Sequence, residues 1–265
     1  ADERLGLSAA LAGSLRERRQ PGKIEHTVHE LLSQRLYAIA CGYEDCNDAA
    51  RLASDPVHRL LARGEASAQA LLASQSTLSR FENAADRASL YPMSVALAAC
   101  VIERHRRRLG KRQVRHVRID LDPTDDPTHG AQQLRFFNGH DDSWCDLPMA
   151  GFVTFNDEPD QYLFCYVLRP GNAPARAGAI GILSRIIERV REAFPKARIL
   201  VRLDGGFAGP ALLNFLDDSD VDYLVGMAEN KVLARRARRR MGRARRLSTR
   251  YAARSWKKRT RRVLI

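Results

Sequence analysis

The sequence predicts an α/β protein in which a mixed sheet follows a helical amino-terminal region. In the middle of the chain, β-type segments follow one another directly: Gln113–Asp122, Leu147–Phe155 and Tyr162–Leu168. Helical and strand patterns then alternate from Gly178 to Val225, which is typical of parallel strands joined by crossover helices. Before residue 111 the apolar residues recur at helical spacing instead. We therefore divide the chain into three regions: a helical region 1–110, an α/β core 111–229 and a basic segment 230–265.

The helical region begins with a charged, irregular stretch, Ala1–Gly22, which we expect to be loosely ordered. From Glu25 the apolar residues recur every three or four positions until Gly42, and Asp55-Pro56 opens a second, short helix. Pro92 is expected to start a further helix, because proline is favoured in a first helical turn. That helix ends in the basic run Arg104–Arg108, which either lies along phosphates or is simply solvated.

The segment Ser74–Asn83 has the pattern of the second helix of a helix-turn-helix. Ser76 is the expected cap, and the early exposed face carries polar side chains and Arg80, which becomes a candidate DNA contact. An ordinary amphipathic helix, packed through Leu78 and Phe81, explains the same pattern. Both interpretations stay open.

The core reads as βββαβαβ, the order of a ribonuclease-H-like sheet. After the three strands, with turns at Gly139–Trp144 and Asn156–Asp160, the expected elements alternate: a helix Gly178–Phe194, a strand Ile199–Asp204, a helix Pro210–Leu216 and a strand Asp222–Val225. Three antiparallel strands followed by crossover units give a mixed sheet with helices on its faces. In this fold the first and fourth strands are neighbours.

Carboxylates stand at the ends of these two strands. Asp120, Asp122, Asp125 and Asp126 fall within seven residues, and the other strand ends in Asp204-Gly-Gly. Ligands and metal ions bind at such strand ends, and Mg²⁺ prefers carboxylate oxygens. Asp122 and Asp204 are the candidate ligands, and Asp120, which shares the strand face of Asp122, is a supporting one. An ordinary acidic turn is the competing interpretation, because Asp and Pro are common turn residues.

The positive charge of the protein is concentrated at its carboxyl end. The formal net charge is +13, from 44 basic and 31 acidic residues, yet residues 230–265 hold 16 of the basic residues and no acidic one. The remaining 28 basic residues are outnumbered by the acidic ones, so the whole excess belongs to this segment. Basic blocks of this kind indicate a polyanionic partner. The candidate DNA contacts in this segment are Arg235, Arg236, Arg239, Arg240, Arg243, Arg246, Lys257 and Lys258.

Two local structures are expected in this basic segment. Asn230 to about Arg246 has a helical pattern, and Arg250–Ile265 reads as two short strands around a basic turn.

Cysteine usage and hydropathy favour a soluble, cytoplasmic protein. The 5 cysteines are scattered, without a Cys-x-x-Cys pair, and are expected to be small buried side chains rather than disulfides or zinc ligands. No apolar run approaches the roughly 20 residues that span a bilayer, and the amino terminus lacks a signal-peptide pattern.

Several of these stretches together resemble the DDE transposases of bacterial insertion sequences, in the group called transposase DDE domain group 1. The matching segments are Ala40–Asp45, Leu72–Asn83, Ile119–Gly130, Phe137–His140, Val167–Asn172 and Val201–Ala208. The resemblance implies DNA cleavage and strand transfer with Mg²⁺ or Mn²⁺, at the terminal inverted repeats of a transposon and in target DNA, by a homodimer. It also implies a bacterial protein that associates with the nucleoid. Asp122 then corresponds to the first acidic residue, in the pattern Asp122-Pro-Thr124, and Asp204 to the second.

The same resemblance implies a third acidic residue, a glutamate on a later helix, after a mostly β insertion that begins near residue 230. The chain has no acidic residue after Glu229. We therefore expect a sequence that stops before the third carboxylate and a chain that is inactive alone, with Glu229 the first candidate if it is active. Asp141 and Asp146 also depart from related sequences, which have aromatic residues there.

A non-enzymatic nucleic-acid-binding protein is the alternative. It would use a degenerate ribonuclease-H-like scaffold and work through its basic tail. Two neighbouring aspartates that repel one another bring nothing to a mere binder, which favours the transposase interpretation.

Overall fold

The structure is a computed structural model that describes residues 2–63, 71–109, 114–128, 136–139, 142–227 and 230–260, without the side chains of residues 63, 233, 239 and 252–260. Contacts between Cα atoms divide the chain into two units, residues 1–225 and 226–265. Among the described residues, no helix is long and apolar enough to cross a bilayer.

The helical region of the first unit has seven α-helices and one short 3-10 helix in its described part: α1 (Asp2–Leu5), α2 (Leu7–Gly13), η1 (Pro21–Lys23), α3 (Val28–Ala40), α4 (Ala49–Leu52), α5 (Pro56–Arg63), α6 (Gln75–Asn83) and α7 (Arg87–Leu109). Helix α3 starts with a capping box, in which Thr27 and Glu30 bond to each other's backbone. Its apolar residues enter two small cores, one with α6 and one with α2.

Three sequence expectations for this region are wrong. The first residues are not loose, because Leu7 and Leu11 lie one turn apart and pack with α3 and α7. Helix α7 begins at Arg87, where Asp86 accepts hydrogen bonds from Ser89, so Pro92 lies inside it.

The third wrong expectation concerns the residue at which α6 starts. Its cap position is occupied by Ser74 rather than Ser76, without a side-chain cap hydrogen bond. The preceding residues Leu72 and Ala73 are buried, and this places the start of the helix two residues earlier than the polar pattern indicated.

A five-stranded mixed sheet forms the centre of the first unit. Its strands are β1 (His116–Pro123), β5 (Met149–Phe155), β6 (Tyr162–Val167), β7 (Arg198–Leu203) and β8 (Asp222–Val225). The spatial order is β6-β5-β1-β7-β8, antiparallel for the pairs β6·β5 and β5·β1 and parallel for β1·β7 and β7·β8. The expected neighbourhood of the first and fourth predicted strands is therefore observed, as β1 beside β7.

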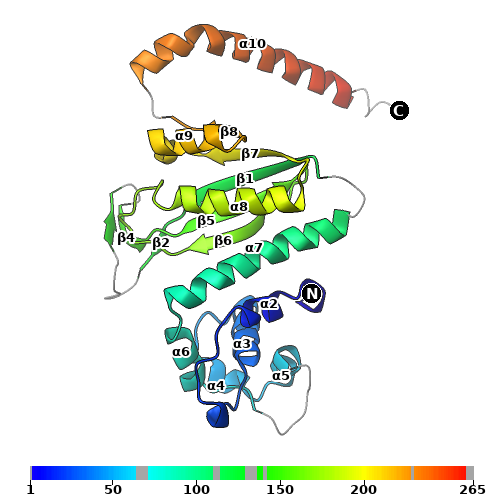
Figure 1. The fold of residues 1–265 in the computed structure, drawn as a ribbon, viewed down its shortest axis with the longest axis vertical. Coiled ribbons are helices and arrows are strands. Elements are labelled where there is room, and N and C mark those ends of the chain that lie inside the picture. Colours follow the sequence, from blue (N-terminus) through cyan, green and yellow to red (C-terminus); the bar gives the residue numbers. More distant parts are fainter. Residues whose placement is uncertain are drawn as a thin grey trace. The chain divides into compact units, whose positions relative to one another are not determined.

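One face of this sheet is covered by helices. The inward side chains of β1 (Val117, Ile119, Leu121) share the main core with α7, α8 (Ala179–Ala193) and α9 (Pro210–Asp218). Figure 1 shows α8 lying across the strands. The apolar stripe predicted for α8 is buried, and α9 begins at Pro210 in the first helical turn.

The opposite face of the sheet carries the alternate residues of each strand. On β1 these are Arg118, Asp120 and Asp122, and on β7 they are Leu200 and Arg202. The helices α7, α8 and α9 share the core of the other face, and Leu224 of β8, which pairs with Arg202 on this face, is 64% exposed.

A second, three-stranded sheet lies between β1 and β5 in the sequence. It consists of β2 (Asp126–Pro127), β4 (Ser143–Asp146) and β3 (Phe136–Asn138), in the order β2-β4-β3. None of these strands was predicted, and the turn expected at Gly139–Trp144 overlaps β4. These strands are too short to show an alternating pattern in the sequence, so they can be recognised only from their pairing in the structure.

The second unit contains α10 (Lys231–Thr260). The helix extends the one expected to end near Arg246, and the two strands predicted in Arg250–Ile265 are wrong for the residues that are described, up to Thr260. The segment is rich in Arg and Ala, which are strong helix formers, and this preference continues through Ala253. Residues 261–265 lie outside the described part.

The cysteine expectation holds for three of the five. Cys46, Cys145 and Cys165 are buried, Cys100 is partly buried, and Cys41 is exposed at the end of α3; all are free.

Candidate metal centre and nucleic-acid surfaces

Asp122 and Asp204 come from neighbouring parallel strands. β1 and β7 pair from His116 beside Arg198 to Asp120 beside Arg202. Asp122 is two residues beyond the last pair on β1, and Asp204 is two residues beyond it on the other strand. Because side chains alternate along a strand, both belong to the face that carries Asp120 and Arg202. The fold therefore directs two carboxylates to one edge of the uncovered face.

The electrostatics of Asp122 reflect this placement. Burial raises the pKa of Asp122 above its ordinary value, and the negative charges of Asp204 and Asp120 raise it further. Asp204 caps the 3-10 helix η2 (Gly205–Phe207), and its Oδ1 accepts a hydrogen bond from the backbone N–H of Gly206 at 3.0 Å. In the described residues neither aspartate has a cation within ion-pair distance. Their oxygens are the donor type that Mg²⁺ and Mn²⁺ prefer, so the residues fit such an ion.

Asp120 has a protein partner instead. Its Oδ1 accepts from Nε of Arg202 at 2.6 Å and its Oδ2 from an amino nitrogen of the same guanidinium at 2.9 Å. Nε of Arg118 lies 3.5 Å from Oδ2. Sequence reasoning missed Arg202, because no local pattern connects it with a residue 82 positions earlier.

No third ligand completes the site among the described residues, where no group of three His, Cys, Asp or Glu side chains is placed to hold a metal ion. Asp125 is exposed, and Asp126 faces Asp146 across β2 and β4. Burial, and then the charge of Asp126, raise the pKa of Asp146. Asp141 and Glu229 lie outside the described residues.

A buried arginine supports the turn that carries Asp204. Arg169 is 8% exposed and donates to the backbone oxygens of Leu147, Pro174, Ala175 and Ala177. Ala175 in turn packs against Gly206, where an added Cβ would lie 2.8 Å from the Ala175 Cβ. This gives Arg169 of the Val167–Asn172 motif a structural role that the sequence did not reveal.

Helix α6 is bonded to α3 near both of its ends. The side chain of Gln34 makes two 3.0 Å hydrogen bonds to the backbone of Ala73, just before α6. Arg35 forms an ion pair with Glu82 of α6 and donates to the backbone oxygen of Glu44 at 3.0 Å.

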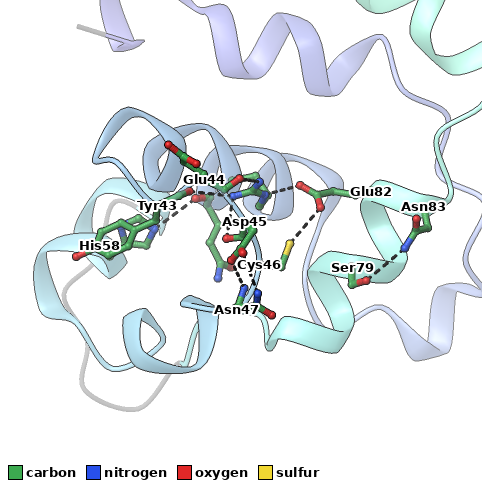
Figure 2. Close-up of polar contacts among 11 residues, drawn as sticks. Tyr43, Glu44, Asp45, Cys46, Asn47, His58, Ser79, Glu82 and Asn83 are labelled. Atoms are coloured by element: carbon green, nitrogen blue, oxygen red, sulfur yellow. Dashed lines mark hydrogen bonds and ion pairs between the residues drawn. The ribbon is translucent and has the colours of Figure 1, made fainter. Parts of the chain in front are cut away.

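The loop Tyr43–Asn47 bonds to the same two side chains, Arg35 and Glu82. Figure 2 shows Cys46 and Glu82 pointing toward one another, with Cys46 Sγ donating to Glu82 Oε2 at 3.1 Å. Leu78 is buried and Arg80 is exposed, so the helix both packs and presents a polar face. The helix-turn-helix hypothesis stays a prediction.

The candidate cations of α10 lie on one side of that helix. At 3.6 residues per turn, Arg235, Arg236, Arg239, Arg240, Arg243 and Arg246 fall within an arc of about 140°. Of these, all but Arg239, whose side chain is not described, are exposed. Lys257 and Lys258 also have undescribed side chains. Arg238 and Arg245 project to the opposite side.

Comparisons with known proteins identify the family of this chain and a solved structure that is similar to it. The family described as Transposase DDE domain group 1 matches residues 1–265. No curated protein matches the chain. A solved structure described as "Crystal structure of a pre-cleavage Mos1 transpososome" is similar at 13% sequence identity and a TM-score of 0.26, over 80% of this chain and 62% of that one. The chain thus spans about three fifths of that protein's chain.

Proposed function

The chain belongs to the family of group 1 transposase DDE domains, and from this premise we propose that it is a ribonuclease-H-like transposase that cuts and joins DNA with divalent metal ions. Its substrates are the terminal inverted repeats of a transposon and the target DNA. The single observation that carries the proposal is the placement of Asp122 and Asp204 at the ends of neighbouring parallel strands.

Asp122 and Asp204 would hold Mg²⁺ or Mn²⁺. When bound, such ions neutralise charge on a phosphodiester and activate the attacking hydroxyl. The raised pKa of Asp122 supports this role, because two carboxylates that repel one another are stabilised by a shared cation. The two aspartates alone make an incomplete site, and we propose that they bind metal but do not cleave DNA without a third carboxylate.

DNA binding is assigned to two surfaces. The arginine face of α10 would contact phosphates without reading sequence, since the helix has no acidic residue. Helix α6 would present Arg80 to a groove.

A non-enzymatic nucleic-acid-binding protein remains the second candidate. The observation that favours it is the concentration of positive charge in α10. It predicts DNA binding that is insensitive to Asp204, and no binding of divalent cations at the strand ends.

The metal site is tested by titrating the 265-residue chain with Mn²⁺ and measuring free Mn²⁺ by electron paramagnetic resonance. Wild type is expected to bind, and Asp204→Asn to weaken binding by about tenfold or more, because a ligand is lost. Asp217→Asn is the matched control, since Asp217 lies on α9 and bonds only the hydroxyl of Tyr223 in the described residues. Equal affinity of wild type and Asp204→Asn would contradict the proposal.

The DNA surface is tested through the salt dependence of binding to a DNA duplex. Each phosphate contact contributes a slope of about −0.9 to log affinity against log salt. Arg236→Gln/Arg240→Gln should reduce the slope by about 2, whereas Arg238→Gln/Arg245→Gln, which removes equal charge from the other side, should change it less. Equal changes would mean that α10 has no preferred face.

A further inference from the structure

The carboxylate of Asp120 is fully engaged by protein cations. Both of its oxygens bond to the guanidinium of Arg202, at 2.6 and 2.9 Å, and its side chain is only 17% exposed. Arg118, which also bonds to Thr154 Oγ1 at 3.2 Å, holds its Nε 3.5 Å from the same carboxylate. A metal ion could use Asp120 only by displacing a two-point, charge-assisted contact.

This cluster lies directly beside the proposed metal ligands. Asp120 precedes Asp122 by two residues on the same face of β1, and Arg202 precedes Asp204 by two residues on β7. Two residues along a strand span about 7 Å. Two guanidinium groups and three carboxylates therefore share this part of the open face, which leaves a formal charge of −1 there instead of −3.

We infer that Arg202 is the internal counter-ion of this centre: it keeps Asp120 out of the ligand set and reduces the negative charge that a divalent cation meets at Asp122 and Asp204. The inference rests on the proposed metal site. It makes Arg202 a residue that sets cation affinity without touching the cation, and it gives Asp120 a role as the anchor of Arg202 rather than as a supporting ligand.

Substitutions on the two sides of this ion pair should act in opposite directions on metal affinity. Arg202→Gln removes a positive charge and frees Asp120, so Mn²⁺ should bind about fivefold more tightly or better. Asp120→Asn leaves the charge of Arg202 unbalanced beside the site, so Mn²⁺ should bind more weakly by a similar factor. A purely structural ion pair would shift the affinity in the same direction whichever partner is removed.

The experiment measures Mn²⁺ affinity and the melting temperature of the 265-residue chain for wild type, both single variants and the double variant Asp120→Asn/Arg202→Gln. The double variant removes no net charge, so its affinity should return close to that of wild type. Arg202→Lys, which keeps the charge, should also stay close. Arg198→Gln is the matched control, because Arg198 pairs with Asp222 at 2.9 Å at the other end of β7.

Three results separate the possibilities. Single variants that shift affinity in the same direction overturn the inference. A double variant as weak as Asp120→Asn overturns it as well, by making Asp120 a ligand. If Asp204→Asn binds Mn²⁺ like wild type, the proposed metal site itself fails. If Asp204→Asn loses Mn²⁺ binding but Arg202→Gln and Asp120→Asn shift the affinity in the same direction, only the counter-ion role of Arg202 fails. The melting temperature shows whether each variant is folded.

Discussion

Replacing Arg169 by methionine should destabilise the first unit and loosen the turn that carries Asp204. Methionine approximates the length and apolar part of arginine but provides no donor. The structure gives Arg169 one hydrogen bond from Nε to the backbone oxygen of Leu147 at 2.9 Å, and bonds from one amino nitrogen to Pro174, Ala175 and Ala177 at 3.1 to 3.2 Å. These oxygens belong to the connection that precedes β5 and to the one that precedes α8.

The magnitude follows from the donors that are lost. Three N–H groups of a buried cation serve the four oxygens, and a bond to a charged group contributes about 1.5 kcal/mol or more to stability. The second amino nitrogen of Arg169 has no partner among the described residues, and burial lowers the pKa of the guanidinium, so part of this gain is offset. We expect Arg169→Met to lower the free energy of unfolding by about 3 to 5 kcal/mol.

Equilibrium unfolding in urea, followed by circular dichroism, measures this change. Arg176→Met is the control, because Arg176 lies in the same connection and is exposed, and it should change the free energy by less than about 0.5 kcal/mol. If Arg169→Met unfolds at the wild-type urea concentration, the oxygens are satisfied by water and the reasoning about Arg169 is wrong.

Three further outcomes are expected. Burial raises the pKa of Cys165 to about 12, so only about one thiol in ten thousand is ionised at pH 8, and a thiol reagent should label the exposed Cys41 much faster; equal rates measured by mass spectrometry would contradict this. Gly171→Ala places a Cβ 2.1 Å from a backbone oxygen of β4 and should cost about 1 to 3 kcal/mol in urea unfolding, unless the strand can move away. Hydrogen bonds from Ser89, and then from Arg18, lower the pKa of Asp86 from 3.8 to about 2. The stabilisation of α7 by the Asp86 carboxylate is therefore fully present above pH 3.8 and is lost as the pH falls toward 2. Nuclear magnetic resonance of the Asp86 carboxyl carbon would detect this titration.

The elements of the core could be predicted because each one is encoded locally. The β-branched run before Asp122 and the apolar stripe of α8 depend on neighbours within a few residues, and both segments form where expected. The short strands β2, β3 and β4 could not be predicted, since strands of two to four residues have no period to recognise and exist only through their pairing. The two strands expected after Arg250 are wrong because the helix preference of Arg and Ala continues through Ala253 and outweighs the short apolar pattern there.

The candidate site divides in the same way. The sequence by itself determined that Asp122 and Asp204 follow two strands and that the motifs around them belong to one family, because strand ends and motifs are properties of contiguous residues. Only the tertiary structure decided what surrounds them. Arg202 reaches Asp120 across 82 positions, and Arg169 collects the oxygens of two separate connections. The pairing of β1 with β7 and the packing of loops bring these partners together. The chain has many arginines, and the residues next to each one do not indicate which distant group its side chain will contact.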